Sequence, residues 1–125
     1  MNEFRIVVIG AGETGTPLLT QLLGASFVKV LGVADLDPEQ PGIALARQHG
    51  VTTTQDFMTL VSKGNEVDII IDVTGVPKVR EELRKYMVDT ANEHTLIMHE
   101  QIALLMMSLS AGKLVQGKHG NQEYH

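Results

Sequence analysis

The sequence predicts an α/β domain in which helices cover both faces of a five-stranded parallel sheet. Three observations support this fold class. The apolar run 6–9 leads directly into a glycine-rich turn, strand-like and helix-like segments alternate along the chain, and short connections join them. A helix that follows each strand returns the chain to the same end of the sheet, so the strands pair in parallel. The aliphatic composition, with no Trp and 43% hydrophobic residues, is typical of such a sheet.

Three glycines follow the first strand with the spacing G-x-G-x-x-G. Gly10 permits a tight turn, Gly12 lets a phosphate approach the backbone, and Gly15 lets the next helix pack closely on the strand. The helix predicted over 16–23 has one apolar face, and Pro17 suits its first turn. Its N-terminus would direct free N–H groups and the positive end of the helix dipole at an anion.

A second strand is predicted at residues 28–34 and ends at Asp35, 20 residues after Gly15. A carboxylate at this position can accept hydrogen bonds from the hydroxyls of an adenosine ribose. The same residues also fit a glycine-rich turn that binds nothing. Because strand, glycine spacing and acidic residue occur together, we favour a Rossmann-type, three-layer dinucleotide-binding domain.

The chain beyond residue 35 alternates between helices and strands without an internal repeat. The predicted elements are a helix at 43–49, a short strand at 51–54, a helix at 55–63, a strand at 67–73, a helix at 78–92, a strand at 94–98 and an extra C-terminal helix at 100–116. Right-handed crossovers predict the strand order 3-2-1-4-5. The ligand crevice then lies between the loops after the first and fourth strands.

We expect residues 1–116 to form a single domain and residues 117–125 to form a flexible polar tail. In the helix at 78–92, the stripe that includes Leu83 and Ala91 should face the sheet. Arg80 and the other charged residues of that helix should face solvent.

Composition argues against several classes of function. The net charge of −5 disfavours nucleic acid and anionic membrane surfaces as partners. Without cysteine, the chain has no disulfide, no thiolate nucleophile and no zinc–thiolate site. The histidines show no metal-ligand spacing, so we predict no metal site. With no basic and hydrophobic leader and no apolar run long enough to span a membrane, we expect a cytoplasmic protein.

Three stretches together resemble the NAD-binding half of an oxidoreductase superfamily: the glycine loop, Val-Ala-Asp at 33–35 and Ile-Asp-Val-Thr-Gly at 71–75. That superfamily includes glucose–fructose oxidoreductase-like enzymes, homoserine dehydrogenase and dihydrodipicolinate reductase. The resemblance covers roughly residues 4–100. The chain is also similar to small Rossmann modules that accompany bacterial signalling proteins, in which Val-Ala-Asp-Leu-(Asp/Asn)-Pro and Ile-Ile-Asp-Val-Thr-Gly recur.

The resemblance implies that the cofactor is NAD. Asp35 would bind the adenosine ribose and repel the 2′-phosphate of NADP, which makes NADP the less favoured cofactor. The candidate cofactor-binding residues come from the loops after the first, second and fourth strands. They are Gly10, Ala11, Gly12, Glu13, Thr14, Gly15, Asp35, Leu36, Thr74, Gly75 and Val76.

Two departures from the resemblance bear on catalysis. The enzymes carry Glu-Lys-Pro after the fifth strand, whereas this chain has Glu-Gln-Ile at 100–102, without the lysine. They also carry a second, substrate-binding domain that 125 residues do not accommodate. We therefore predict no catalytic residue and favour a stand-alone NAD-binding module with a sensory or regulatory role.

Two alternatives remain open at this stage. The chain fits the nucleotide-binding part of an NAD-dependent dehydrogenase whose substrate domain lies elsewhere. It also fits a coenzyme A-binding or purely structural interaction module, although Asp35 disfavours the 3′-phosphate of coenzyme A.

Polar residues near the fourth and fifth strands have competing interpretations. His94, His99 and Glu100 cluster near the fifth strand, where a histidine can act as an acid or base. We favour a structural role in the strand start and helix cap. Asp72 lies in an apolar strand and would either orient the loop 74–77 or contact a ligand.

The last predicted helix is apolar over most of its circumference. One face carries Ile102, Leu105, Met106 and Leu109. Another face carries Ala103, Leu104, Met107, Ala111 and Leu114. A helix at the edge of a domain needs only one apolar stripe. We therefore predict that residues 100–116 bind a second copy of the chain or a partner protein.

Overall fold

The computed structural model describes residues 2–13 and 15–116. Two predictions lie outside the described residues: the cofactor-binding role of Thr14 and the polar tail at 117–125.

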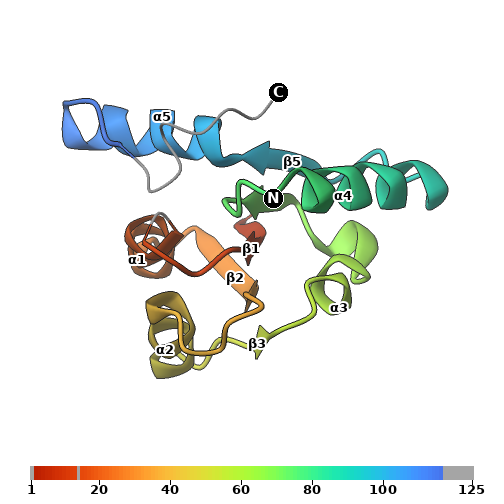
Figure 1. The fold of residues 1–125 in the computed structure, drawn as a ribbon, viewed down its shortest axis with the longest axis horizontal. Coiled ribbons are helices and arrows are strands. Elements are labelled where there is room, and N and C mark those ends of the chain that lie inside the picture. The colour runs from red at the N-terminus through yellow and green to blue at the C-terminus, as the bar shows by residue number, and fades with distance from the viewer. Residues whose placement is uncertain (1, 14, 117–125) are drawn as a thin grey trace.

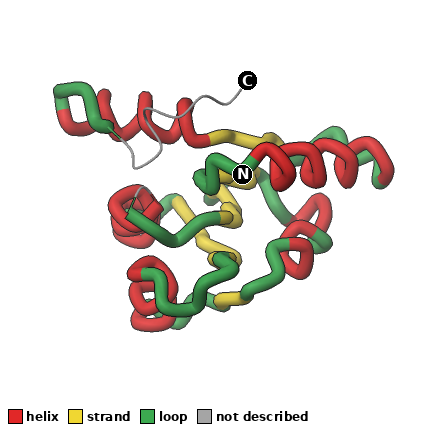
Figure 2. The backbone as a smooth tube through the Cα atoms, in the orientation of Figure 1, coloured by secondary structure: helices red, strands yellow, loops and turns green. Residues whose placement is uncertain are grey.

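The chain forms one parallel sheet with the order β3-β2-β1-β4-β5. Its strands are β1 (Phe4–Ile9), β2 (Val28–Ala34), β3 (Thr53–Thr54), β4 (Ile69–Asp72) and β5 (Leu96–His99). Figure 2 shows these strands between the helices that flank them. The predicted α/β class and strand order are confirmed.

Helices cover both faces of the sheet, as Figure 1 shows: α1 and α2 lie on one side, and α3 and α4 on the other. The helices are α1 (Gly15–Gly24), α2 (Pro41–Gln48), α3 (Met58–Val61), α4 (Pro77–Asp89) and α5 (Glu100–Ala111), with a 3₁₀ turn at Gly64–Glu66. No helix in the described part of the chain combines the length and apolar character that a membrane crossing requires.

Strand β1 separates two hydrophobic cores. Ile6 and Val8 pack with apolar residues of α1, α2 and α5, whereas Val7 and Ile9 pack with residues of α3 and α4. Successive side chains of a strand point to opposite faces, so a strand covered on both sides is apolar at every position. This explains why the run in β1 is continuous rather than alternating.

Helix α3 is shorter than the predicted helix at 55–63. The Asp56 carboxylate accepts a hydrogen bond from the backbone N–H of Met58 at 3.0 Å, and the Thr54 hydroxyl accepts one from the N–H of Asp56 at 3.1 Å. Such local side-chain bonds give the backbone an alternative to helix. The residues before Met58 therefore form a turn.

Helices α4 and α5 also end earlier than predicted. Gly112 has φ 72°, a left-handed conformation that ends α5, and Ser108 Oγ accepts a hydrogen bond from the Val115 N–H at 2.9 Å. The segment after Gly112 thus turns back onto the helix. Ala91 has φ 53° beyond the end of α4 and is exposed, so its predicted place facing the sheet is wrong.

An ion-pair cluster joins the amino ends of β1, β4 and β5. The buried carboxylate of Asp68 accepts hydrogen bonds from the backbone N–H of Arg5 at 2.8 Å and from its guanidinium at 3.1 and 3.2 Å. His94 Nε2 lies 2.6 Å from the same carboxylate. The hydrogen bonds from Arg5, assisted by His94, hold the pKa of Asp68 well below its usual range.

We expect Asp68→Asn to lower the free energy of unfolding near neutral pH and to flatten its dependence on pH. The pKa of Asp68 is lower in the folded state than in the unfolded state, where it is about 4. The contribution of the carboxylate is therefore complete above the unfolded pKa and is lost as the pH falls toward the folded pKa. Urea unfolding at about pH 7 and about pH 3 measures both effects.

Asp89→Asn is the matched control for this variant. Asp89 pairs with Lys85 on an exposed helix face, where an ion pair contributes little. An Asp68→Asn variant that is as sensitive to pH as the wild type would contradict the assignment.

Candidate functional site

Several cavities of the described residues open at the carboxyl edge of the sheet, and two of them involve the loop after β4. We name the first the loop cavity; it has a volume of about 310 Å³ and is lined by the glycine loop and the segments that follow β2, β3 and β4. The second, the helix cavity, has a volume of about 610 Å³ and lies between the end of β4, helix α4, helix α5 and the segment after α5. Val76 lines both. Both volumes lie in the range of small-molecule sites.

The three glycines of the loop have different structural requirements. Gly10 has φ +107°, and a Cβ there would lie 3.0 Å from Val73 Cγ2. A Cβ on Gly15 would overlap the carbonyl oxygen of Gly10. Of the described residues, a Cβ on Gly12 would meet only the side chain of Gln40, at 3.5 Å, which is an ordinary contact. The fold therefore requires Gly10 and Gly15, whereas the missing side chain of Gly12 leaves room in the loop cavity.

The peptide groups of Ala11 fix the glycine loop in place. The Ala11 N–H donates to Asp35 Oδ2 at 2.8 Å. The Ala11 carbonyl accepts from the Gly42 N–H at 2.8 Å and from Thr16 Oγ1 at 3.2 Å. Its side chain is 1% exposed and belongs to the core rather than to the lining of the loop cavity. The end of β2, the start of α2 and the start of α1 thus hold one residue of the loop.

Asp35 follows β2 directly and lines the loop cavity. Besides Ala11, it binds the N–H of Asp37 through Oδ1 at 2.9 Å. Each carboxylate oxygen has two lone pairs, so both can accept a further hydrogen bond from a hydroxyl group. Leu36 lies beside it and is 83% exposed.

The loop after β4 is organised by Asp72, which is buried. Its Oδ1 accepts hydrogen bonds from the Thr74 N–H at 3.0 Å and from Thr74 Oγ1 at 2.7 Å. Thr74 Oγ1 in turn accepts from the Val76 N–H at 3.2 Å, and Gly75 has φ +67°. Of the two roles considered for Asp72, the orientation of this loop is confirmed.

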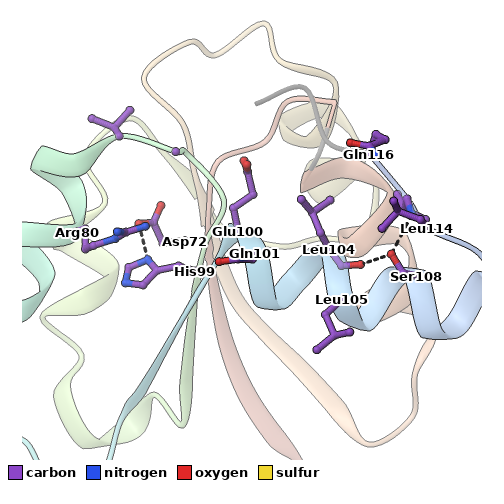
Figure 3. A pocket seen from close by; sticks show the side chains of 13 residues that line it. Asp72, Arg80, His99, Glu100, Gln101, Leu104, Leu105, Ser108, Leu114 and Gln116 are labelled. Carbon is purple, nitrogen blue, oxygen red and sulfur yellow. Dashed lines mark hydrogen bonds and ion pairs between the residues drawn. The ribbon is translucent and has the colours of Figure 1, made fainter. Parts of the chain in front are cut away.

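Asp72 and His99 are paired across β4 and β5. His99 Nδ1 lies 3.1 Å from Asp72 Oδ2, and both residues line the helix cavity (Figure 3). Arg80 of α4 lines the same cavity, so its predicted orientation toward solvent is wrong. The Arg80 Nε is buried and has no hydrogen-bond partner within the described part of the chain.

The structure brings most of the predicted cofactor residues together. Those that line the loop cavity are Gly10, Gly12, Glu13, Gly15, Asp35, Leu36, Thr74 and Val76. Gly75 lines the helix cavity instead. His94 lies at the opposite edge of the sheet, in the cluster around Asp68.

Seven residues that line the loop cavity were not among the predicted cofactor residues. Three of them end predicted strands: Ile9, Ala34 and Val73. The other four are Gln40, Gln55, Phe57 and Val79. Gln55 and Phe57 follow β3, whose carboxyl end lies at the same edge as those of β1 and β2. The strand order alone therefore places them near the glycine loop. Gln40 and Val79 had no such signal, because neither follows a strand directly.

No family model matches the chain. Over 73 residues it is 30% identical to an acetaldehyde dehydrogenase of Carboxydothermus hydrogenoformans, an alignment that covers 58% of this chain and 24% of that protein. Over 78 residues it is 37% identical to the acetaldehyde dehydrogenase of Sphingobium yanoikuyae, covering 59% of this chain and 25% of that protein. The chain thus spans about a quarter of the length of these relatives.

Solved structures share the fold. An NAD-binding protein from Listeria innocua superposes with a TM-score of 0.56 at 19% identity, covering 89% of this chain and 34% of that one. GenD2 from gentamicin A biosynthesis, solved in complex with NAD, gives a TM-score of 0.60 at 18% identity. The superposition covers 78% of this chain and 27% of the GenD2 chain. The predicted resemblance to NAD-binding Rossmann-type oxidoreductases is confirmed, whereas the likeness to modules of signalling proteins stays a prediction.

We expect Gly15→Ala to destabilise the fold by about 1–3 kcal/mol, because the added Cβ overlaps Gly10. Gly24→Ala in the same helix is the matched control, since no heavy atom of residues 2–13 or 15–116 outside the local helix lies within 4 Å of its added Cβ. That variant should be neutral or more stable by up to about 1 kcal/mol. Urea unfolding measures both, and equal effects would contradict the packing described here.

Proposed function

We propose that this chain binds NAD, with the adenosine and pyrophosphate in the loop cavity. The observation that carries the proposal is the glycine at position 12. Packing within the protein accounts for the other two glycines. Among the described residues, a side chain on Gly12 would meet only Gln40, and it would take space in the loop cavity. A ligand phosphate that approaches the backbone closely accounts for its absence.

Each part of the dinucleotide has a matching group along the carboxyl edge. Asp35 would accept hydrogen bonds from the ribose hydroxyls of adenosine, and its charge would repel the 2′-phosphate of NADP. The N-terminus of α1 would face the pyrophosphate. The loop of Thr74 and Val76 would continue toward the nicotinamide half, since Val76 also borders the helix cavity. The NAD complex of GenD2, which shares the fold, supports this choice of cofactor.

We expect NAD, at about a hundred times its dissociation constant, to raise the free energy of unfolding by about 2.7 kcal/mol. Gly12→Val should fold and lose this response, because its side chain would occupy the cavity that receives the phosphates. Asp35→Asn should narrow the preference for NAD over NADP, since it removes the charge that repels the 2′-phosphate. Thermal shift and calorimetric titrations with NAD, NADH, NADP and coenzyme A measure these effects.

Gly24→Ala serves as the control for a glycine substitution remote from the cavity. No response of the wild type to millimolar NAD or NADH would contradict the proposal. A response to coenzyme A alone would favour the alternative ligand considered from the sequence.

The use of the bound dinucleotide is a second part of the proposal. We propose a sensory or regulatory module, in which binding of NAD changes how helix α5 contacts a second copy of the chain. One side of α5 lines the helix cavity through Gln101 and Ser108. The other side exposes Ile102, Met106 and Leu109. The alternative, favoured by the relatives, is the nucleotide-binding part of an NAD-dependent dehydrogenase.

We expect the wild type to form a dimer, and the double variant Met106→Glu, Leu109→Glu to be monomeric, because two charges would then lie on the contact face. Met107 is unsuitable for this test, since it is 7% exposed and packs in the core. Light scattering after gel filtration, with and without NAD, gives the solution mass.

Val88→Glu is the matched control, because Val88 is 79% exposed on α4. It should leave the dimer intact. A wild type that is monomeric both with and without NAD would overturn self-association. Turnover of NAD by the chain upon addition of a separate substrate domain would favour the dehydrogenase alternative.

A further inference from the structure

The helix cavity has two chemically different ends, and Figure 3 shows both. Asp72, Arg80 and His99 gather at one end, where β4, α4 and β5 meet. Leu104 and Leu114 lie at the other end, on α5 and the segment that follows it. A cavity of about 610 Å³ with a charged end and an aliphatic end favours an amphipathic ligand.

Arg80 is the cation at the polar end. Its Nε is buried and has no hydrogen-bond partner within the described part of the chain. A buried donor without a partner is unfavourable, and because this Nε is covered, a ligand in the cavity gains its hydrogen bond only together with a shift of the Arg80 side chain. Nε and one terminal nitrogen of a guanidinium form the two parallel donors that a carboxylate accepts in side-on geometry.

The acidic residues of the cavity differ from Arg80 in that both already have partners. The carboxylate of Asp72 accepts hydrogen bonds from the Thr74 N–H and from Thr74 Oγ1, and its Oδ2 lies 3.1 Å from His99 Nδ1. Glu100 is 5% exposed and is also engaged in an interaction. Arg80 thus remains as the group able to take up a ligand anion.

The turn after α5 borders the aliphatic end, where Leu114 is 76% exposed. Ser108 Oγ donates to the Leu104 carbonyl at 2.7 Å and accepts from the Val115 N–H at 2.9 Å. These two bonds hold the segment with Leu114 against the helix, so that Leu104 and Leu114 line one wall. Their side chains offer a ligand only dispersion and hydrophobic contact.

We propose that the helix cavity binds an aliphatic monocarboxylic acid, with its carboxylate on Arg80 and its alkyl chain against Leu104 and Leu114. This site goes beyond the proposed NAD site and does not depend on it. The ligand is a carboxylate rather than a phosphate because a single planar anion matches one guanidinium. Asp72 and Glu100 would also disfavour a second negative charge.

The test is a calorimetric titration of the whole chain with acetate, butanoate, hexanoate and octanoate. Affinity should rise about fourfold for each methylene group that enters the aliphatic end. Hexylamine and hexanol serve as probes of the same length without the negative charge, and both should bind at least about tenfold more weakly than hexanoate.

Arg80→Gln should weaken hexanoate binding by about tenfold or more, because it removes the charge and the paired donors. Arg84→Gln is the matched control, since Arg84 lies one turn further along α4 and is exposed. In the wild type, hexanoate should shift the NMR resonance of the Arg80 Nε–H, which is assigned by its loss in Arg80→Lys. If Arg80→Gln does not fold, the chain-length series and this resonance decide the question.

Equal binding of hexanoate and hexylamine would overturn the proposal, as would equal losses in the Arg80 and Arg84 variants. Titration of NAD into the same samples separates the two sites. Hexanoate binding without NAD binding would refute the proposed function and leave this inference standing. NAD binding that Arg80→Gln weakens, with no carboxylate bound, would assign the helix cavity to the nicotinamide half and overturn the inference.

Discussion

The arrangement of the loop cavity depends on the hydrogen bond from the Ala11 N–H to Asp35 Oδ2. It joins the turn after β1 to the end of β2, while the bond from Gly42 to the Ala11 carbonyl adds α2. Because the two peptide groups that flank the Ala11 Cα are each hydrogen-bonded to another element, the glycine loop is positioned before any ligand arrives. Preorganisation of this kind lowers the ordering cost of binding. Asp35 thus has a structural role in addition to its predicted contact with the ribose.

Sequence reasoning predicted the sheet well and the helix ends poorly. Continuous apolar runs and glycine spacing depend on burial, which the whole fold imposes, so the strand order and the bounds of β2 followed from the chain. Helix ends depend on single local contacts. The Asp56 carboxylate shortened α3, and the left-handed Gly112 ended α5 before the predicted residue. The spacing of apolar residues reveals neither a capping hydrogen bond nor a left-handed residue.

The same limit applies to the cavities. The glycine loop and Asp35 carry a recognisable spacing, so their gathering at one edge was predictable. The sequence predicts Arg80 to be a surface residue, because helical periodicity gives its position around the axis of α4. Periodicity does not show which other elements cover the first turn of that helix. Only the placement of α4 beside β5 and α5 shows that this turn borders a cavity. The roles of the lining residues toward NAD stay predictions.

Val76 lines both cavities, and this shared wall has a thermodynamic consequence. Two ligands that contact opposite sides of one side chain both act on its rotamer distribution. If both ligands prefer the same Val76 rotamer, the first ligand to bind orders the side chain, and the second binds without that entropy cost. If they prefer different rotamers, each ligand weakens the binding of the other. Linkage makes the effect reciprocal: whatever factor the first ligand applies to the affinity of the second, the second applies to the first.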